Sequence, residues 1–347
     1  MIENRKEDHI DICLEKDVEI KKNYWEDIKL FHQAAPEIDL EDVSIKTDFL
    51  DGRLDAPLVI AGITGGYEGA KGLNRILART AEKTGIGLGV GSQRPALEEE
   101  RLRDSYELIS EYSIPLVIGN IGAPQLISQD GEKPFGVEEA EEALQMIDGD
   151  YLAVHFNYLQ EAVQPEGDLN SKGVLNALKR ISEKVSTIAK ETGAGVAPEM
   201  AKDFLDAGVD AIDVGGMGGT SFSAVEYHRI HDDDKMKKIA DDLRDWGIPT
   251  PVSLKMCRGS VSLPLIATGG IRNGVQIAKA LALGANTVGI AGGILPAVKE
   301  GEKAAVEYIE RLKYELKLTM FLMGCEKPKD LVDVNRVITG EVKRWLE

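Results

Sequence analysis

The stretch LPLIATGGIRNGVQIAKALALGANTVGIAGGIL, residues 263–295, holds two apolar runs that each carry a Gly-Gly pair. The runs cover residues 263–274 and 285–295, and a segment of helical length separates them. Nearly continuous apolar character is typical of strands that are covered on both faces, as in parallel sheets. The stretch therefore predicts a strand, a helix and a second parallel strand.

Similar runs recur along the preceding chain, at residues 56–66, 85–94, 114–125, 149–157, 184–193 and 209–221. The segments between the runs show helical spacing of apolar residues, as at Leu73, Ile76 and Leu77. Eight strands, each followed by a helix, predict an α/β fold of the (β/α)8 TIM-barrel type. A doubly wound open sheet is the alternative. The charged segment 228–247, before the seventh strand, predicts a solvated helix face.

The length of 347 residues fits a single TIM-barrel domain, 1–347. Residues 1–50 precede the barrel and predict an N-terminal extension containing a helical hairpin. Residues 51–323 form the predicted barrel, and residues 324–347 form a C-terminal tail.

Composition excludes several classes of partner. The formal net charge of −18 argues against nucleic acid or an anionic membrane as the main partner. No apolar run approaches the roughly 18 residues of a membrane helix, and the first residues lack the apolar centre of a signal peptide. We therefore expect a cytoplasmic protein. Its three cysteines are far apart and show neither metal-binding nor disulfide spacing.

Glycines at the ends of the last two strands predict a phosphate site. In a barrel, chemistry sits at the carboxyl ends of the strands, and the loops after strands seven and eight commonly bind phosphate. Glycine lets backbone N–H groups approach an anion there. Gly269, Gly270 and Gly292 have this placement, and Arg272 adds a cation. Tight turns without a ligand are the alternative.

Other predicted strand ends suit a flat heteroaromatic ring. Thr64, Asn120 and Thr220 offer hydrogen bonds to ring edges. Lys190 places a positive charge against a ring that becomes anionic on reduction, as a flavin does at N1. A salt bridge with Glu191 or another nearby carboxylate is the alternative for Lys190. No GxGxxG follows the first strand, so a nicotinamide cofactor bound in the Rossmann manner is not expected.

The stretch HFNYLQEAVQPEGD, residues 155–168, gathers polar groups after the fourth strand. Glu161 is a candidate Mg²⁺ ligand that acts together with substrate phosphate oxygens. The alternatives are a surface carboxylate at Glu161, a rim histidine at His155, and amides at Asn157 and Gln160 that tie down the loop.

Two sources of positive charge indicate an anionic ligand. Arg94 ends the second strand, and Arg5 and Lys6 form a basic pair near the N-terminus. Cations from these two places could clamp a diphosphate, provided that the N-terminal segment folds over the barrel mouth. A solvated terminus is the alternative.

The chain resembles the type 2, FMN-dependent isopentenyl diphosphate isomerases through motifs that occur in the same order. These are RKEDH (5–9), GITGG (62–66), GSQR (91–94), HFNYLQEAVQPEGD (155–168), GGMGGTS (215–221) and TGGIRNG (268–274). The resemblance implies an FMN-binding (β/α)8 barrel that interconverts isopentenyl and dimethylallyl diphosphates in isoprenoid biosynthesis. It also implies Mg²⁺, NADPH as electron source, and a homo-oligomer, often a tetramer or octamer.

The resemblance also assigns roles to residues. Substrate contacts would come from Arg5, Lys6, Ser92, Gln93, Arg94, His155, Asn157 and Gln160, with His9 a further candidate. Gln160 would be catalytic, and Glu161 would bind the metal. FMN would contact Ile63, Thr64, Gly65, Ser92, Asn120, Lys190 and Thr220, and its phosphate Gly269, Gly270, Arg272, Ala291 and Gly292. The chain departs from many relatives at Gly215, where a serine is common, and at Phe222, where a tryptophan is common.

The implied chemistry agrees with the residue types. Isomerisation moves a double bond and transfers no net electrons, so we hypothesise that reduced flavin N5 carries the proton transfers. Gln160 would then orient the substrate or relay a proton. The alternatives are an FMN-dependent barrel oxidoreductase of the 2-hydroxy acid oxidase or dihydroorotate type, and a non-catalytic flavin- or phosphate-binding sensor. The oxidoreductase should carry a histidine base after strand seven, and no histidine follows His231.

Overall fold

The computed structural model describes residues 2–67 and 69–347, with side chains from Lys6 onward. Eight parallel strands close into a barrel in the order of the chain, and the last strand, β11, pairs with the first, β4. Their bounds are β4 (Leu58–Ile60), β5 (Gly87–Gly89), β6 (Val117–Gly122), β7 (Tyr151–Phe156), β8 (Thr187–Glu191), β9 (Ala211–Asp213), β10 (Leu265–Thr268) and β11 (Thr287–Ile290). Because β4 pairs with both β5 and β11, the barrel is confirmed and the open sheet is excluded.

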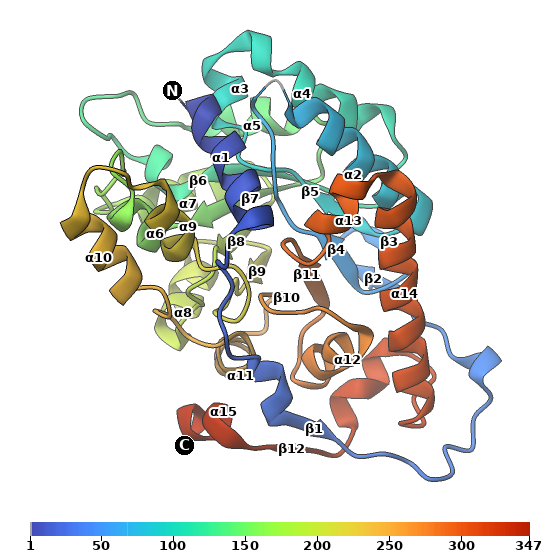
Figure 1. Cartoon of the computed structure of the whole chain (residues 1–347). Coiled ribbons are helices and arrows are strands. Elements are labelled where there is room, and N and C mark those ends of the chain that lie inside the picture. The colour runs from blue at the N-terminus through green and yellow to red at the C-terminus, as the bar shows by residue number, and fades with distance from the viewer. Residues whose placement is uncertain (1, 68) are drawn as a thin grey trace.

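Helices surround the barrel as an outer layer (Figure 1). The longer ones are α2 (Ala70–Thr84), α5 (Val137–Gln145), α7 (Val174–Ser182), α8 (Pro198–Asp206), α11 (Thr250–Ser260), α12 (Gly274–Ala282) and α14 (Glu302–Phe321). Short helices in the loops are α3 (Arg94–Glu98), α4 (Asp104–Glu107), α6 (Tyr158–Val163), α9 (Phe222–Arg229), α10 (Asp234–Asp242) and α13 (Leu295–Glu300). The predicted apolar stripe of α2 faces inward, since Leu77 is buried and the half-buried Leu73 and Ile76 pack against the core.

The barrel interior changes from apolar to polar along the strands. Side chains of alternate residues point to the same face of a strand. One layer of the interior is apolar and contains Val59, Ile118, Ala153, Ile188, Ala211 and Ile266. Two residues further along five of these strands lie Asn120, His155, Lys190, Asp213 and Thr268. These five residues, here called the polar layer, close the barrel at its carboxyl end.

Within the described residues of the N-terminal extension, 2–50, there is one α-helix, α1 (Ile2–Glu15), so the predicted helical hairpin is wrong. The chain after α1 is drawn into an extended path by the barrel, because Glu19 bridges Thr220 and Ile20 N–H donates to the carbonyl of Gly219. Further along, β2 (Thr47–Phe49) and β3 (Gly52–Leu54) form a hairpin. The 3-10 turns are Tyr24–Asp27, Leu40–Asp42, Glu100–Leu102, Leu108–Glu111, Ala123–Leu126 and Pro328–Asp333.

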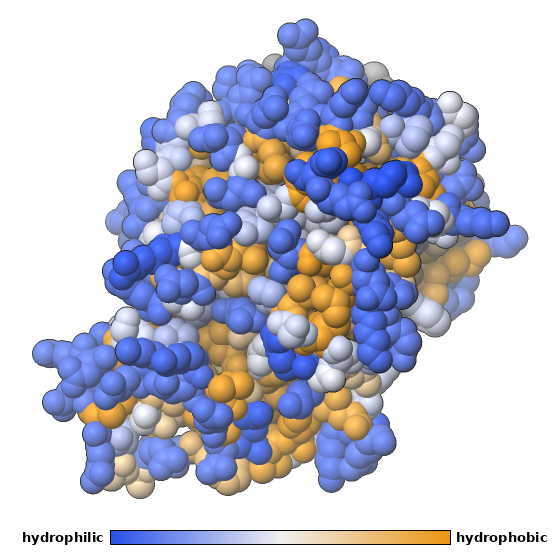
Figure 2. Space-filling model, turned by 180° about the vertical axis from the view of Figure 1, so that it is seen from behind, coloured by the Kyte–Doolittle hydropathy of each residue, from blue (hydrophilic) through white to orange (hydrophobic). Residues whose placement is uncertain are grey.

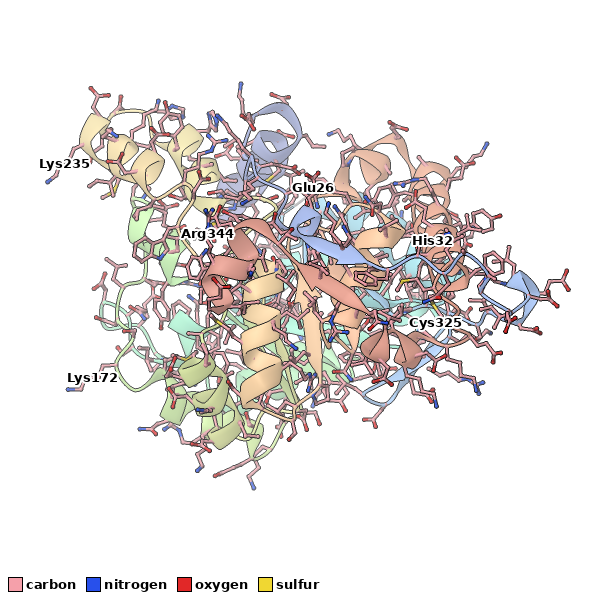
Figure 3. The ribbon with its side chains drawn as sticks, turned by 90° about the horizontal axis from the view of Figure 1, so that it is seen from below. Glu26, His32, Lys172, Lys235, Cys325 and Arg344 are labelled. Carbon is pink, nitrogen blue, oxygen red and sulfur yellow. The ribbon has the colours of Figure 1, made fainter. Side chains whose placement is uncertain are left out.

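The extension and the tail form one structure. Strand β1 (Ile28–Leu30) pairs antiparallel with β12 (Arg336–Ile338), and α15 (Gly340–Leu346) follows. Seen from below, this pair lies beneath the barrel, with Glu26 and Arg344 on its neighbouring segments (Figure 3). The two predicted terminal segments therefore meet on the outer layer of the barrel, where β1 contacts α12 and α15 contacts α11.

The surface is largely hydrophilic. Figure 2 shows polar and charged residues over most of the rear face, with apolar residues between them. The charged segment 228–247 contains α10, which packs Ala240 inward and exposes most of its charged side chains. Among the described residues, no helix combines the length and apolar character that a bilayer crossing requires.

Candidate active site

A cavity of about 260 Å³ opens at the carboxyl ends of the strands. Every barrel strand, or the loop after it, contributes to the lining, and α1 adds Lys6, His9, Ile10 and Cys13. The N-terminal segment therefore does fold over the barrel mouth. The polar layer forms part of the floor, through Asn120, His155, Lys190 and Thr268.

Most of the predicted site residues line this cavity. They are Lys6, Ile63, Thr64, Ser92, Arg94, Asn120, His155, Asn157, Gln160, Glu161, Lys190, Thr220, Gly269, Gly270, Arg272, Ala291 and Gly292. Gly65 lies just outside the lining, where its carbonyl accepts a hydrogen bond from Lys6. The side chain of Arg5 lies outside the described part of the chain.

The side chain of Gln93 does not line the cavity with the other predicted site residues. Its side chain is fully buried, its Nε2 donates to the carbonyl of Ala143, and its Oε1 accepts from the N–H of Asn120. These contacts stabilise the end of β6 behind the cavity wall. The structure therefore places Gln93 as a support of Asn120, and a direct substrate contact stays a prediction.

A glycine cradle lies after β10 and suits a phosphate group. Gly269 and Gly270 have φ angles of 129° and 71°, which glycine adopts at little cost. A Cβ on Gly269 would lie 2.3 Å from the carbonyl oxygen of Gly216, and one on Gly270 would lie 2.4 Å from that of Gly218. Arg272 completes this end of the cavity and forms an ion pair with Glu19. The cradle suits a phosphate because glycines without side chains let backbone N–H groups approach an anion.

Lys190 projects from the polar layer into the cavity. Its Nζ lies 3.8 Å from Asp213 Oδ2 and donates to the carbonyl of Glu191. Of the alternatives for Lys190, a salt bridge to the Glu191 side chain is wrong, because that carboxylate accepts from the N–H groups of residues 193–195. A salt bridge to another nearby carboxylate is confirmed by Asp213. Burial raises the pKa of Glu191 to about 7 against the opposing effect of these N–H groups.

His155 is oriented by Asn120. The Nδ2 of Asn120 donates to the carbonyl of Val90, which leaves Oδ1 as the acceptor for His155 Nδ1 at 2.8 Å. His155 therefore carries its proton on Nδ1 in this arrangement.

The predicted basic residues are already in contact with protein groups. Arg94 forms ion pairs with Glu98, Glu132 and Asp168. Lys6 Nζ donates to the carbonyls of Gly65 and Ser92 at 2.8 and 2.5 Å, and it lies 3.2 Å from the hydroxyl of Tyr106. These contacts tie α1 to the loops after β4 and β5.

Glu161 is buried between amides. It accepts hydrogen bonds from Asn157 Nδ2 at 2.8 Å, from Gln164 Nε2, and from the N–H of Asp168. The oxygens Asn157 Oδ1 and Gln164 Oε1 are buried without a hydrogen-bond partner. One carboxylate and unpaired amide oxygens are the donor types that Mg²⁺ prefers. Within the described residues, no three His, Cys, Asp or Glu side chains gather as a metal cluster.

Glu226 of α9 is a site residue that the sequence interpretation missed. Its side chain is fully buried, and it meets Gln160 Nε2 at 3.0 Å and His9 Nε2 at 2.9 Å, with Arg229 on its other oxygen. Burial raises the pKa of Glu226, but these partners outweigh burial and hold the pKa below its usual value. The feature of the sequence that could have identified Glu226 is its position six residues after Thr220, on the helix that follows the glycine-rich motif.

One family model and several known proteins are similar in sequence to this chain. The family model described as FMN-dependent dehydrogenase matches residues 184–337. The isopentenyl-diphosphate delta-isomerase of Thermoplasma acidophilum is 43% identical over 100% of this chain and 99% of its own length. The protein of the same name from Archaeoglobus fulgidus is 44% identical over 99% of this chain and 98% of its own.

Solved structures show the same fold at low identity. A mandelate oxidase mutant with an FMN adduct superposes with a TM-score of 0.64 at 16% identity, covering 91% of this chain and 89% of its own. A lactate oxidase from Pediococcus acidilactici gives the same score and identity, with 91% and 84% covered.

Proposed function

The chain belongs to the isopentenyl-diphosphate delta-isomerase family, in its FMN-dependent type 2 form, and we propose that its barrel mouth holds cofactor, metal and substrate in one cavity. The protein is an isomerase that interconverts isopentenyl and dimethylallyl diphosphates and uses FMN. The observation that carries the proposed arrangement is the shared lining of that cavity, which unites the glycine cradle, Lys190 and Glu161.

The FMN phosphate would bind at the cradle of Gly269, Gly270 and Gly292 with Arg272. The ring would lie over the polar layer, with Lys190 beside its N1 edge. Ile63, Thr64, Gly65, Ser92, Asn120, Thr220 and Ala291 would provide the other FMN contacts. When bound in reduced form, FMN supplies the acid/base chemistry at N5 that moves the double bond without net electron transfer.

The diphosphate would bind at the other side of the cavity. Glu161 would hold Mg²⁺ together with substrate phosphate oxygens, and the unpaired oxygens of Asn157 and Gln164 support a cation at this place. Arg5, Lys6, Ser92, Gln93, Arg94, His155 and Asn157 are proposed to bind or support the diphosphate. The apolar lining from Ile10, Cys13 and Phe222 suits the hydrocarbon part of the substrate.

Gln160 is the proposed catalytic side chain. Its amide nitrogen is held by Glu226, so the amide plane has a fixed direction at the cavity wall. Gln160 would orient the alkene or pass a proton toward Glu226 and His9.

NADPH is the proposed source of electrons. The proposed assembly is a homo-oligomer such as a tetramer or octamer, and the proposed location is the cytoplasm.

The test is an anaerobic assay of purified protein with FMN, NADPH, Mg²⁺ and isopentenyl diphosphate. We expect dimethylallyl diphosphate to form with far less than one NADPH consumed per product. Consumption of one NADPH per product would favour the oxidoreductase alternative. Absence of product under reducing conditions would overturn the proposed function.

A further inference from the structure

Asp213 is a buried carboxylate directly behind Lys190. The two residues are register partners on the neighbouring strands β8 and β9, and both belong to the polar layer. Lys190 lines the main cavity and also a small cavity of about 20 Å³ inside the barrel, whereas Asp213 lines only the inner one. The carboxylate therefore approaches the ammonium group from the barrel interior, away from the space proposed for the flavin.

Neighbouring groups hold the Asp213 side chain in place. Its Oδ2 accepts from Thr268 Oγ1 at 2.9 Å, and its Oδ1 accepts from the N–H of Gly215 at 3.2 Å. Only 3% of the residue is exposed. Burial raises the pKa of its carboxyl group, and the charge of Lys190 opposes that effect.

The charge of Asp213 is not needed for its hydrogen bonds. A neutral acceptor at this position would satisfy both Thr268 and Gly215, and burying a charge costs free energy unless a partner compensates it. The compensating partner is Lys190, at 3.8 Å. Because a bare ammonium beneath a flavin ring would favour its anionic reduced form, a carboxylate behind the ammonium moderates that preference.

We propose that Asp213 is a positioning residue that holds the Lys190 ammonium at the cavity floor and limits the positive charge acting on the flavin ring. The inference rests on the proposed function, since it places the ring over Lys190. The anionic reduced form keeps its proton at N5, and an ion pair leaves the N1 edge of the ring easier to protonate than an isolated cation does.

The experiment measures the two-electron midpoint potential of FMN bound to the Asp213→Asn protein. Asparagine removes the negative charge and can keep both contacts, because its carbonyl oxygen can accept from the N–H of Gly215 and its NH2 group can donate to Thr268 Oγ1. We expect the preference for reduced over oxidised FMN to rise on the order of tenfold, which is a shift of about 30 mV upward. Asp210→Asn is the matched control. It removes a carboxylate just before the same strand, where Asp210 accepts the N–H of Thr187, and it should leave the potential unchanged.

A potential equal to that of the wild type in folded, FMN-loaded Asp213→Asn would overturn the inference while leaving the isomerase assignment intact. If the asparagine variant fails to fold, Asp213→Ser provides the same measurement with a smaller side chain, and an unchanged potential there has the same meaning. A wild-type protein that binds no FMN would instead overturn the proposed function and this inference together.

Discussion

Gln160 and Glu226 are joined by a hydrogen bond of 3.0 Å, and the Glu226 oxygen that accepts it also lies 2.9 Å from His9 Nε2. The contact links three segments, since Gln160 lies on α6, Glu226 on α9 and His9 on α1. Helix α1, which lies over the barrel mouth, is thereby connected through the buried carboxylate of Glu226 to the side-chain amide of Gln160, the proposed catalytic group.

Replacing Glu226 with glutamine should lower kcat about 10- to 100-fold, because Gln160 and His9 lose a charged acceptor. Steady-state kinetics with saturating FMN and Mg²⁺ would measure the loss. Glu166→Gln is the control, since Glu166 pairs with the other side of Arg229 and is half exposed. Equal activity in both variants would contradict a role for Glu226.

Replacing Glu161 with glutamine should raise the Mg²⁺ concentration needed for half-maximal activity at least about tenfold, because a neutral amide binds this hard cation weakly. A Mg²⁺ titration of the initial rate provides the measurement. Glu132→Gln removes an exposed partner of Arg94 and should keep the wild-type titration curve. An unshifted curve for Glu161→Gln would exclude this carboxylate as the ligand.

Tyr106→Phe should raise KM for isopentenyl diphosphate about fivefold and leave FMN affinity unchanged. The hydroxyl is buried, donates to the carbonyl of Ser92 and lies beside Lys6 Nζ, so its loss weakens the attachment of α1. Tyr151→Phe is the matched control, because that hydroxyl bonds Asp51 at the opposite end of the barrel. Equal KM values in the two variants would contradict this role of the Tyr106 hydroxyl.

Gly270→Ala should weaken FMN binding about hundredfold, because the residue has a φ of 71° and its Cβ would meet the carbonyl of Gly218. Quenching of FMN fluorescence gives the dissociation constant. Gly72→Ala on α2, where a Cβ would have no neighbour within 4 Å, should bind FMN like the wild type. Wild-type affinity for FMN in Gly270→Ala would show that the FMN phosphate does not bind at this glycine cradle.

Glu191 should make folding stability fall as pH rises. Its folded pKa of about 7 lies above the ordinary glutamate value of 4.5, so folding takes up a proton between these values. The loss should reach at most about 1.4 kcal/mol per pH unit in this window and end above pH 7. Denaturant melts of wild type and Glu191→Gln from pH 4.5 to 8 test the expectation. Parallel curves for the two proteins would refute it.

The barrel was predictable from the sequence because most strands lie in apolar runs with glycine or polar residues at their carboxyl ends, whereas the run that gives β8 is weaker because it includes Ser186 and Thr187. The cavity lining was largely predictable for the same reason, since residues that follow parallel strands meet at one end of the barrel. Lys190 and Glu161 are examples. Their partners were harder to infer, because Asp213 and Glu226 become neighbours of these groups only when strands and helices are in register.

The N-terminal extension was the part that sequence periodicity described poorly. Residues after α1 have no regular partner nearby in the chain, and their conformation is set by Thr220 and by the distant strand β12. Gln93 shows the same limitation at a single residue. The GSQR motif locates it at the barrel mouth, but the carbonyl of Ala143 directs its side chain into the core.

The pairing of Ile28 with Ile338 has a consequence for the order of events during synthesis. Strand β1 leaves the ribosome before every strand of the barrel, yet its partner β12 emerges only after the last of them. The barrel between them can assemble from neighbouring units as they appear, because each strand pairs with the next one. We therefore expect β1 to reach its native partner only after the barrel strands have been synthesised.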